Sequence, residues 1–222
     1  MLFRGTFIGA ASGKVGSCVA SHNKGGQYMR ARVVPSGRVP STYQSAVRNA
    51  IAGIATYWKT ITKTQRDAWN TYALNIPGKN ALGDAIQLSG ENWYVACNVP
   101  RLQAGLARVD DAPVIYDRGD VAIGTATITA AGGTATLALT PALSTVAADK
   151  LLIYQGNQQS ATRDKYYGSY RYAGSAAGTI TNFVLTLPLP LSGAGNRTSF
   201  RLVMSRSDGR LSSAELISFP AA

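Results

Sequence analysis

The chain has 222 residues, of which 45% are hydrophobic and 15% are charged, and its formal net charge is +11. This length suits one large domain or two small ones, and the hydrophobic content is sufficient for a buried core. The longest apolar runs are far shorter than the roughly 18–20 residues that span a bilayer, so no transmembrane helix is expected. The start, MLFRGTFIGAASG, lacks the continuous apolar region of a signal peptide because Arg4, Gly5 and Thr6 interrupt it. The two cysteines, Cys18 and Cys97, lie in different predicted elements, which favours reduced thiols over a disulfide framework.

Residues 1–40 are predicted to form an extended basic arm or a hairpin rather than a core of their own. The segment Phe7–Pro35 is rich in Gly, Ser and basic residues and indicates short strands joined by glycine turns. The alternation in Gln27–Val34 places Arg30 and Arg32 on one face of a strand. The chain has no Asp or Glu before Asp67, whereas ten Lys and Arg precede it. Such one-sided charge predicts a negative partner, which is nucleic acid, a membrane surface or an acidic protein surface. The candidate partner-binding residues of the arm are Arg4, Lys14, Lys24, Tyr28, Arg30, Arg32 and Arg38.

Residues 41–110 are predicted to form a small helical domain. Ser41 with Gln44, and Thr62 with Gln65, have the spacing of capping boxes that begin two helices. A third helix is expected to open at Ser89 and to be broken or kinked near Pro100. In the first helix, the residues that recur at helical spacing are Val47, Ile51, Ile54, Ala55 and Trp58. The second helix is expected to bury Ala68, Trp69, Tyr72 and Ala73, and the third carries Trp93, Val95 and Ala96. The three tryptophans are expected to form a hydrophobic cluster, with an aromatic ligand cage as the alternative.

The sequence pattern changes at residues 107–118, and residues 111–222 are predicted to form a β-sandwich. Asp208-Gly209 is the strongest short hairpin signal in the chain. Seven strands in about 100 residues are typical of an immunoglobulin or fibronectin type III sandwich, and the absence of a Cys-Trp-Cys core pattern favours the fibronectin-like form. The predicted strands are Val121–Thr129, Thr134–Thr140, Lys150–Gln155, Tyr166–Tyr172, Thr179–Leu187, Thr198–Arg206 and Leu211–Phe219. The fold class is therefore mainly β with a small helical section.

Catalytic and metal-binding patterns are weak throughout the sequence. His22 is the one histidine, which leaves a metal site or a Ser-His-Asp triad with little support. Gly9–Val15 departs from the phosphate-binding loop pattern because Val15 follows the lysine. Asp110 and Asp111 are adjacent and point in opposite directions in an extended chain, so turn capping and linker solvation are expected of them. No catalytic residue, cofactor or metal is expected.

Three segments resemble the opening of a group of small uncharacterised proteins from bacteria and their phages. These are Ser12–Gly16 (SGKVG), Lys24–Arg30 (KGGQYMR) and Pro40–Gln44 (PSTYQ) followed by Arg48. In that group, this pattern precedes a helical stretch and an immunoglobulin-like end. The segments Thr64–Asn70 and Leu88–Asn92 look like those of phage-borne members, and the resemblance covers roughly residues 9–115. It implies a component of a virion or of another assembly, by analogy.

Three functions are therefore weighed. The first is a non-enzymatic structural protein of a tailed bacteriophage virion (capsid, head decoration or tail), which is assembled in the host cytoplasm. Its arm would contact other copies of the chain or other virion proteins in a homo-oligomer or lattice, with contact to DNA possible and no membrane involved. The second is a nucleic-acid-binding protein that uses the basic segment. The third is an adhesin or carbohydrate-binding module with a platform of Tyr166, Tyr170 and Tyr172 on one strand face and Tyr167 on the other.

Overall fold

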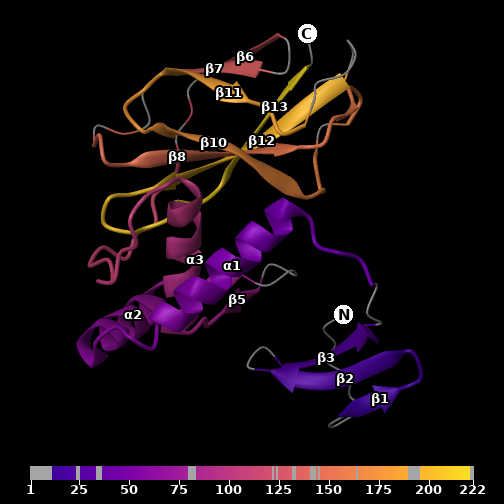
Figure 1. Ribbon diagram of the computed structural model, residues 1–222, viewed down its shortest axis with the longest axis vertical. Coiled ribbons are helices and arrows are strands. Elements are labelled where there is room, and N and C mark those ends of the chain that lie inside the picture. The colour runs from indigo at the N-terminus through magenta and orange to yellow at the C-terminus, as the bar shows by residue number, and fades with distance from the viewer. Residues whose placement is uncertain are drawn as a thin grey trace. The chain divides into compact units, whose positions relative to one another are not determined.

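A computed structural model describes residues 12–23, 26–33, 37–79, 84–121, 123, 125–131, 134–140, 144, 146–163, 165–189 and 196–220 (Figure 1). The chain forms two compact units: unit 1 is Met1–Ala46 with Lys79–Ile86, and unit 2 is Val47–Gly78 with Gln87–Ala222. Several antiparallel sheets and three helices make up the described residues, which confirms a mainly β fold with a small helical section. The domain boundary predicted at 110/111 falls inside unit 2.

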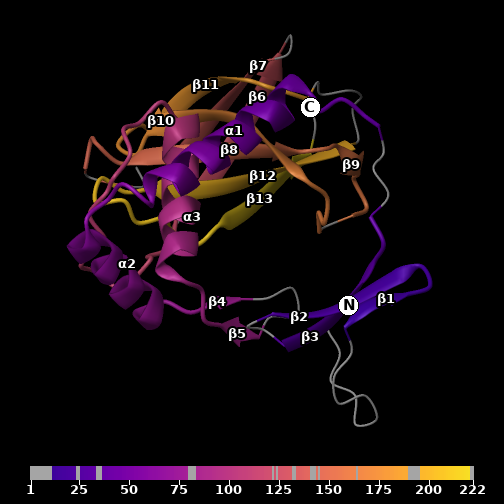
Figure 2. The same cartoon turned by 60° about the horizontal axis from the view of Figure 1, so that its bottom comes forward.

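Unit 1 contains a three-stranded antiparallel sheet, here called the N-terminal sheet. Its strands are β1 (Gly13–Val15), β2 (Cys18–Asn23) and β3 (Gly26–Ala31), in the order β1-β2-β3 (Figure 2). Gly16 has φ +59° as the first central residue of the β1–β2 turn, a position that type II′ hairpins give to glycine. Within the described residues, the predicted short strands and the glycine turn at Gly16 are confirmed, and they form a sheet, which agrees with the predicted hairpin rather than with an extended arm. Two further strands of two residues each, β4 (Gly78–Lys79) and β5 (Ala85–Ile86), pair with each other.

Three helices begin where the capping signals place them. In α1 (Thr42–Tyr57), the backbone N–H of Ser41 donates to Gln44 Oε1 at 3.1 Å and that of Gln44 donates to Ser41 Oγ at 3.2 Å. The same reciprocal bonds join Thr62 and Gln65 at the start of α2 (Lys63–Asn75). In α3 (Gly90–Gln103), Ser89 is the N-cap and accepts from the N–H of Asn92. These caps satisfy backbone donors that a helix N-terminus otherwise leaves unpaired.

Two predictions about the helices were wrong, one of them in part. The predicted break near Pro100 does not occur, since α3 continues through Pro100 to Gln103, whereas a kink there stays a prediction. Ala68 is exposed, since the buried face of α2 is centred on Trp69 and Ala73, and Ala68 lies about 100° around the helix from Trp69. In α1, Ile54 is buried but Ile51 is 44% exposed, so the predicted stripe is only partly covered.

The predicted tryptophan cluster is confirmed in unit 2. Trp69 contacts Tyr72 and Tyr94 edge to face, with ring centroids 5.6 and 5.5 Å apart, and Tyr72 contacts Trp93 at 5.9 Å. Trp58 packs against this buried group from the end of α1. Such edge-to-face pairs add to the stabilisation that comes from burial of the rings.

The C-terminal part of unit 2 consists of two antiparallel sheets. The larger has the order β10-β8-β12-β13 with β9 also paired to β12, and the smaller has the order β11-β7-β6. Their strands are β6 (Thr125–Ala131), β7 (Thr134–Thr140), β8 (Lys150–Gly156), β9 (Gln159–Ser160), β10 (Tyr170–Ala177), β11 (Asn182–Thr186), β12 (Asn196–Ser205) and β13 (Glu215–Pro220). β12 and β13 are antiparallel neighbours on either side of Asp208-Gly209, where Gly209 has φ +92°.

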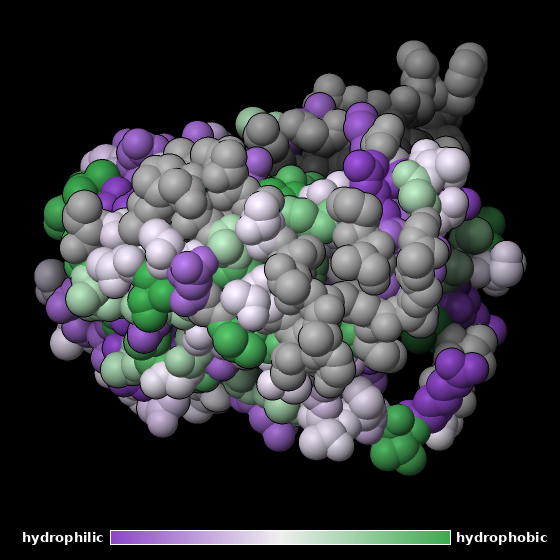
Figure 3. All heavy atoms as spheres, turned by 90° about the horizontal axis from the view of Figure 1, so that it is seen from above, coloured by the Kyte–Doolittle hydropathy of each residue, from purple (hydrophilic) through white to green (hydrophobic). Residues whose placement is uncertain are grey.

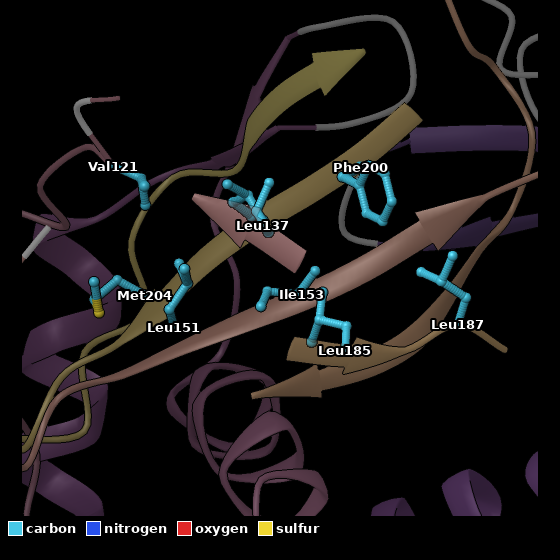
Figure 4. Close-up of a cluster of buried hydrophobic side chains, with 9 residues drawn as sticks. Val121, Leu137, Leu151, Ile153, Leu185, Leu187, Phe200 and Met204 are labelled. Atoms are coloured by element: carbon cyan, nitrogen blue, oxygen red, sulfur yellow. The ribbon is translucent and has the colours of Figure 1, made fainter. Parts of the chain in front are cut away.

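Both sheets contribute to one hydrophobic core. Leu137 of β7 and Leu185 of β11 cluster with Ile153 of β8 and with Phe200 and Leu202 of β12 (Figure 4). Four of these five side chains are fully buried and Leu185 is 3% exposed. Side chains of β8 and β12 thus share a buried cluster with side chains of the smaller sheet.

Candidate partner-binding surface

The strand register of the N-terminal sheet gathers basic side chains on one face. Lys14 pairs with Val19, and Val19 pairs with Arg30, so these three residues form one row across β1, β2 and β3. Cross-strand partners project to the same face, and residues two apart in a strand do so as well. Tyr28, two residues before Arg30, therefore shares this surface, which we call the basic face.

Arg32 extends the basic face by one residue beyond β3. Its backbone N–H donates to Ser17 O at 2.8 Å, which continues the β2–β3 register past the end of the strand. Lys14, Arg30 and Arg32 are exposed, and Tyr28 is half-buried. Among the described residues, none of these three cations forms an ion pair with a carboxylate. Their charge is therefore directed to solvent or to a partner.

The opposite face of the N-terminal sheet carries mostly small and apolar side chains. By the same parity, this face holds Val15, Cys18, Ala20, Met29 and Ala31, together with the polar His22 and Gln27. Ala20 is 3% exposed and is the one buried side chain among the described residues of β1–β3, whereas Val15 is 60% exposed. The sheet thus has two chemically distinct faces.

The predicted partner-binding residues fall into three groups. Lys14, Tyr28, Arg30 and Arg32 come together on the basic face. Arg38 is exposed in the irregular segment 37–41 that precedes α1 and is not part of the sheet. Arg4 and Lys24 lie outside the described residues.

Sequence reasoning missed the two β2 residues on the basic face, Val19 and Ser21. The signal for them was the Gly16-Ser17 turn, because a two-residue hairpin loop fixes the pairing of Val15 with Cys18 and hence that of Lys14 with Val19. No such pairing was assigned from the sequence, so the position of Lys14 relative to Arg30 was not predicted.

The proposed tyrosine platform is not formed as expected. β10 begins at Tyr170, so the parity argument does not extend to Tyr166, which precedes the strand. Tyr166 and Tyr170 contact each other edge to face at 5.0 Å, and Tyr172 contacts Tyr154 in the same way at 5.6 Å. Tyr167 is 89% exposed. Edge-to-face pairs present ring edges as well as faces, which differs from a flat stacking surface for a sugar.

The carboxylates at the junction of helices and sheets bind to groups of this chain. Arg108 donates two hydrogen bonds to Asp110, and Tyr94 Oη donates a third at 2.9 Å. The hydrogen bonds from Arg108 hold the pKa of Asp110 below its usual range, and burial together with the bond to Asp110 raises the pKa of Tyr94. Asp111 accepts from Gln65 Nε2 at 2.9 Å. The two aspartates thus attach the segment that contains them to α2 and α3, which differs from the turn capping and linker solvation expected of them.

On the face of the molecule in Figure 3, hydrophobic side chains form small patches that are separated by polar ones. Within the described ranges, no cluster of three or more His, Cys, Asp or Glu has the arrangement of a metal site. No helix of the described chain is both long and apolar enough to cross a bilayer.

Comparison with protein-family models, with curated proteins and with solved structures finds no match to this chain.

Proposed function

We propose that the chain is a non-enzymatic assembly protein of a tailed-phage virion, in which the N-terminal segment makes the contacts between subunits. The observation that supports this most directly is the poor burial of that segment. A three-stranded sheet needs a covered hydrophobic face for stability, and within β1–β3 the described buried side chain is the small Ala20. A segment of this kind gains order from a neighbour.

Three exposed valines lie in the described part of the segment from β1 to the start of α1. Val15, Val33 and Val39 are 60%, 73% and 90% exposed. Burial of a valine side chain on a partner contributes about 1.5 kcal/mol or more, so three such residues are a substantial source of binding energy. The two sheets of unit 2, which we assign to a fibronectin-like sandwich, supply the compact body that the segment connects to other subunits.

The first test is removal of residues 1–40. Light scattering and electron microscopy of the full chain are expected to show regular oligomers, and the truncated chain is expected to remain folded but monomeric. Circular dichroism and tryptophan fluorescence report on folding, because Trp69 and Trp93 lie in the core of unit 2. A truncated chain that assembles like the full chain contradicts the proposal.

A point-variant test avoids the deletion. Val15→Ser, Val33→Ser and Val39→Ser in one chain should weaken assembly and leave the unfolding midpoint unchanged. The matched control replaces three exposed valines of unit 2 by serine: Val114, Val146 and Val184. Equal assembly of the two triple variants would remove the N-terminal segment from the subunit contact. If the full chain is monomeric by itself, the same two triple variants are compared for binding to a preformed virion lattice.

A further inference from the structure

We infer that the basic face of the N-terminal sheet binds the phosphate backbone of nucleic acid, without sequence preference. This inference goes beyond the assembly role and does not require it, because the apolar residues proposed for assembly differ from the cations of the basic face. Three features carry it: the spacing of the cations, the state of the chain's own carboxylates and the position of Tyr28.

The spacing of the cations suits a repeating row of anions. Neighbouring strands lie about 4.8 Å apart, so Lys14 and Arg30, two strands apart, have Cα atoms about 10 Å from each other. Arg30 and Arg32 are two residues apart along an extended chain, or about 7 Å. Phosphates of one strand recur every ~3.4 Å along the axis of a duplex, so a patch about 10 Å long that runs parallel to this axis extends over about three phosphates.

The chain's own acidic residues are a poor match for the basic face. Of the eleven acidic residues, seven accept hydrogen bonds or ion pairs from groups of unit 2 itself. These seven are Asp67, Asp110, Asp111, Asp117, Asp120, Asp149 and Asp208. In a second copy, these bonds already occupy part of the acceptor capacity of seven carboxylates and would compete with Lys14, Arg30 and Arg32. A nucleic acid offers phosphates that are already exposed and releases bound counterions on contact, which favours it as the polyanion.

Tyr28 adds a contact that a phosphate-only site lacks. It lies on the same face as Lys14 and Arg30, two residues from Arg30 on β3, and it is half-buried. Aromatic side chains beside a basic surface stack on unpaired bases irrespective of sequence. Single strands are therefore expected to bind at least as well as duplexes, and Tyr28→Ala is expected to weaken single-strand binding about tenfold.

The experiment measures binding of the full chain to a fluorescent 30-nucleotide poly-dT strand and to a mixed-sequence 30-base-pair duplex between 50 and 200 mM NaCl. The test variant carries Lys14→Gln, Arg30→Gln and Arg32→Gln. The matched control removes the same number of positive charges from exposed positions of unit 2, with Lys59→Gln, Lys165→Gln and Arg171→Gln. Single Arg30→Gln is a milder variant in case the triple variant folds poorly.

The expected result is a salt dependence of duplex binding that is flatter in the test variant by about 2 to 3 in the slope of log K against log salt, with about 1 for Arg30→Gln. Over this fourfold salt range, a slope difference of about 2 to 3 means that the affinity of the wild type falls about 16- to 64-fold further than that of the test variant. The control variant should keep the wild-type slope. Equal slopes in the two triple variants overturn the inference, as does binding of poly-glutamate in place of either oligonucleotide. Assembly measured on the same variants stays intact if the inference holds, so its failure is separable from that of the assembly proposal.

Discussion

The packing of α2 against α3 predicts that one glycine of unit 2 does not tolerate a methyl group. A Cβ atom at Gly90 would lie 2.5 Å from Asn70 Oδ1, 2.7 Å from Asn70 N and 2.8 Å from Trp69 C. Two of these atoms belong to the backbone of α2, so the helices themselves must separate. Overpacking of this kind costs about 1–3 kcal/mol, and the separation also loosens the Trp69 cluster. Gly90→Ala is therefore expected to destabilise unit 2 by about 2 kcal/mol.

The control is the same substitution at Gly53 in α1. A Cβ atom there meets no other atom within 4 Å, so Gly53→Ala should stabilise the helix by about 0.5–1 kcal/mol. Urea unfolding followed by tryptophan fluorescence measures both free energies in the full chain. A Gly90→Ala protein as stable as the wild type would refute the close helix contact, and so would equal effects at the two positions.

Two titratable groups give further predictions. The hydrogen bonds from Arg108 lower the pKa of Asp110 in the folded protein. The contribution of Asp110 to the free energy of unfolding is therefore fully present above about pH 4, which is the pKa of an aspartate in an unfolded chain, and it is lost as the pH falls through the lower pKa of the folded protein. The stability difference between the wild type and Asp110→Asn should accordingly shrink as the pH is lowered below about 4 in urea titrations, and a constant difference would contradict this ion pair. Complete burial raises the pKa of the Cys97 thiol to about 12, whereas Cys18 is half-exposed. Iodoacetamide should modify Cys18 first in the native protein, as mass spectrometry of digests would show, and early modification of Cys97 would contradict its burial.

The sequence was most informative where a local rule decides the structure. Ser41 with Gln44, and Thr62 with Gln65, identify two helix starts, because a capping box depends on residues within one turn. The alternation of Thr134–Thr140 gives β7 with its observed bounds, since a half-buried strand repeats every two residues. These elements require no knowledge of distant residues.

Predictions failed where distant residues decide the outcome. Ala68 fits an apolar helix pattern, yet it is exposed because the direction of the α2 core is set by what covers Trp69 and Tyr72. Tyr166 has the parity of Tyr170, but it precedes β10 and its hydroxyl accepts from the N–H of Asn157, which fixes the ring outside the strand. Periodicity predicts which residues share a face, but it does not predict where a strand begins.

The candidate site was predicted in composition but not in geometry. Lys14, Arg30 and Arg32 are notable in the sequence because no carboxylate accompanies them. Their common face depends on the pairing of β1, β2 and β3, which the glycine turns encode and which periodicity within a single strand does not. The two-residue hairpin loop at Gly16-Ser17 sets Lys14 opposite Val19, and the separate pairing of β2 with β3 sets Val19 opposite Arg30.

Several arginines of unit 2 form bonds within the fold, whereas those of the N-terminal sheet are exposed, and this difference shows which positive charges are available to a partner. In unit 2, Arg101 donates to Arg206 O at 2.7 Å, Arg118 donates to Leu211 O at 3.0 Å, and Arg210 pairs with Asp208. These guanidinium groups hold turns against the helices and sheets, where their planar donors match several acceptors at once. Lys14, Arg30 and Arg32 of the N-terminal sheet form no ion pair within the described residues. Their removal is therefore expected to leave the free energy of unfolding nearly unchanged. A charged side chain that forms no bond within its own fold is available to bind a partner. The basic face is therefore the surface to test for partner binding, although unit 2 contains more arginines.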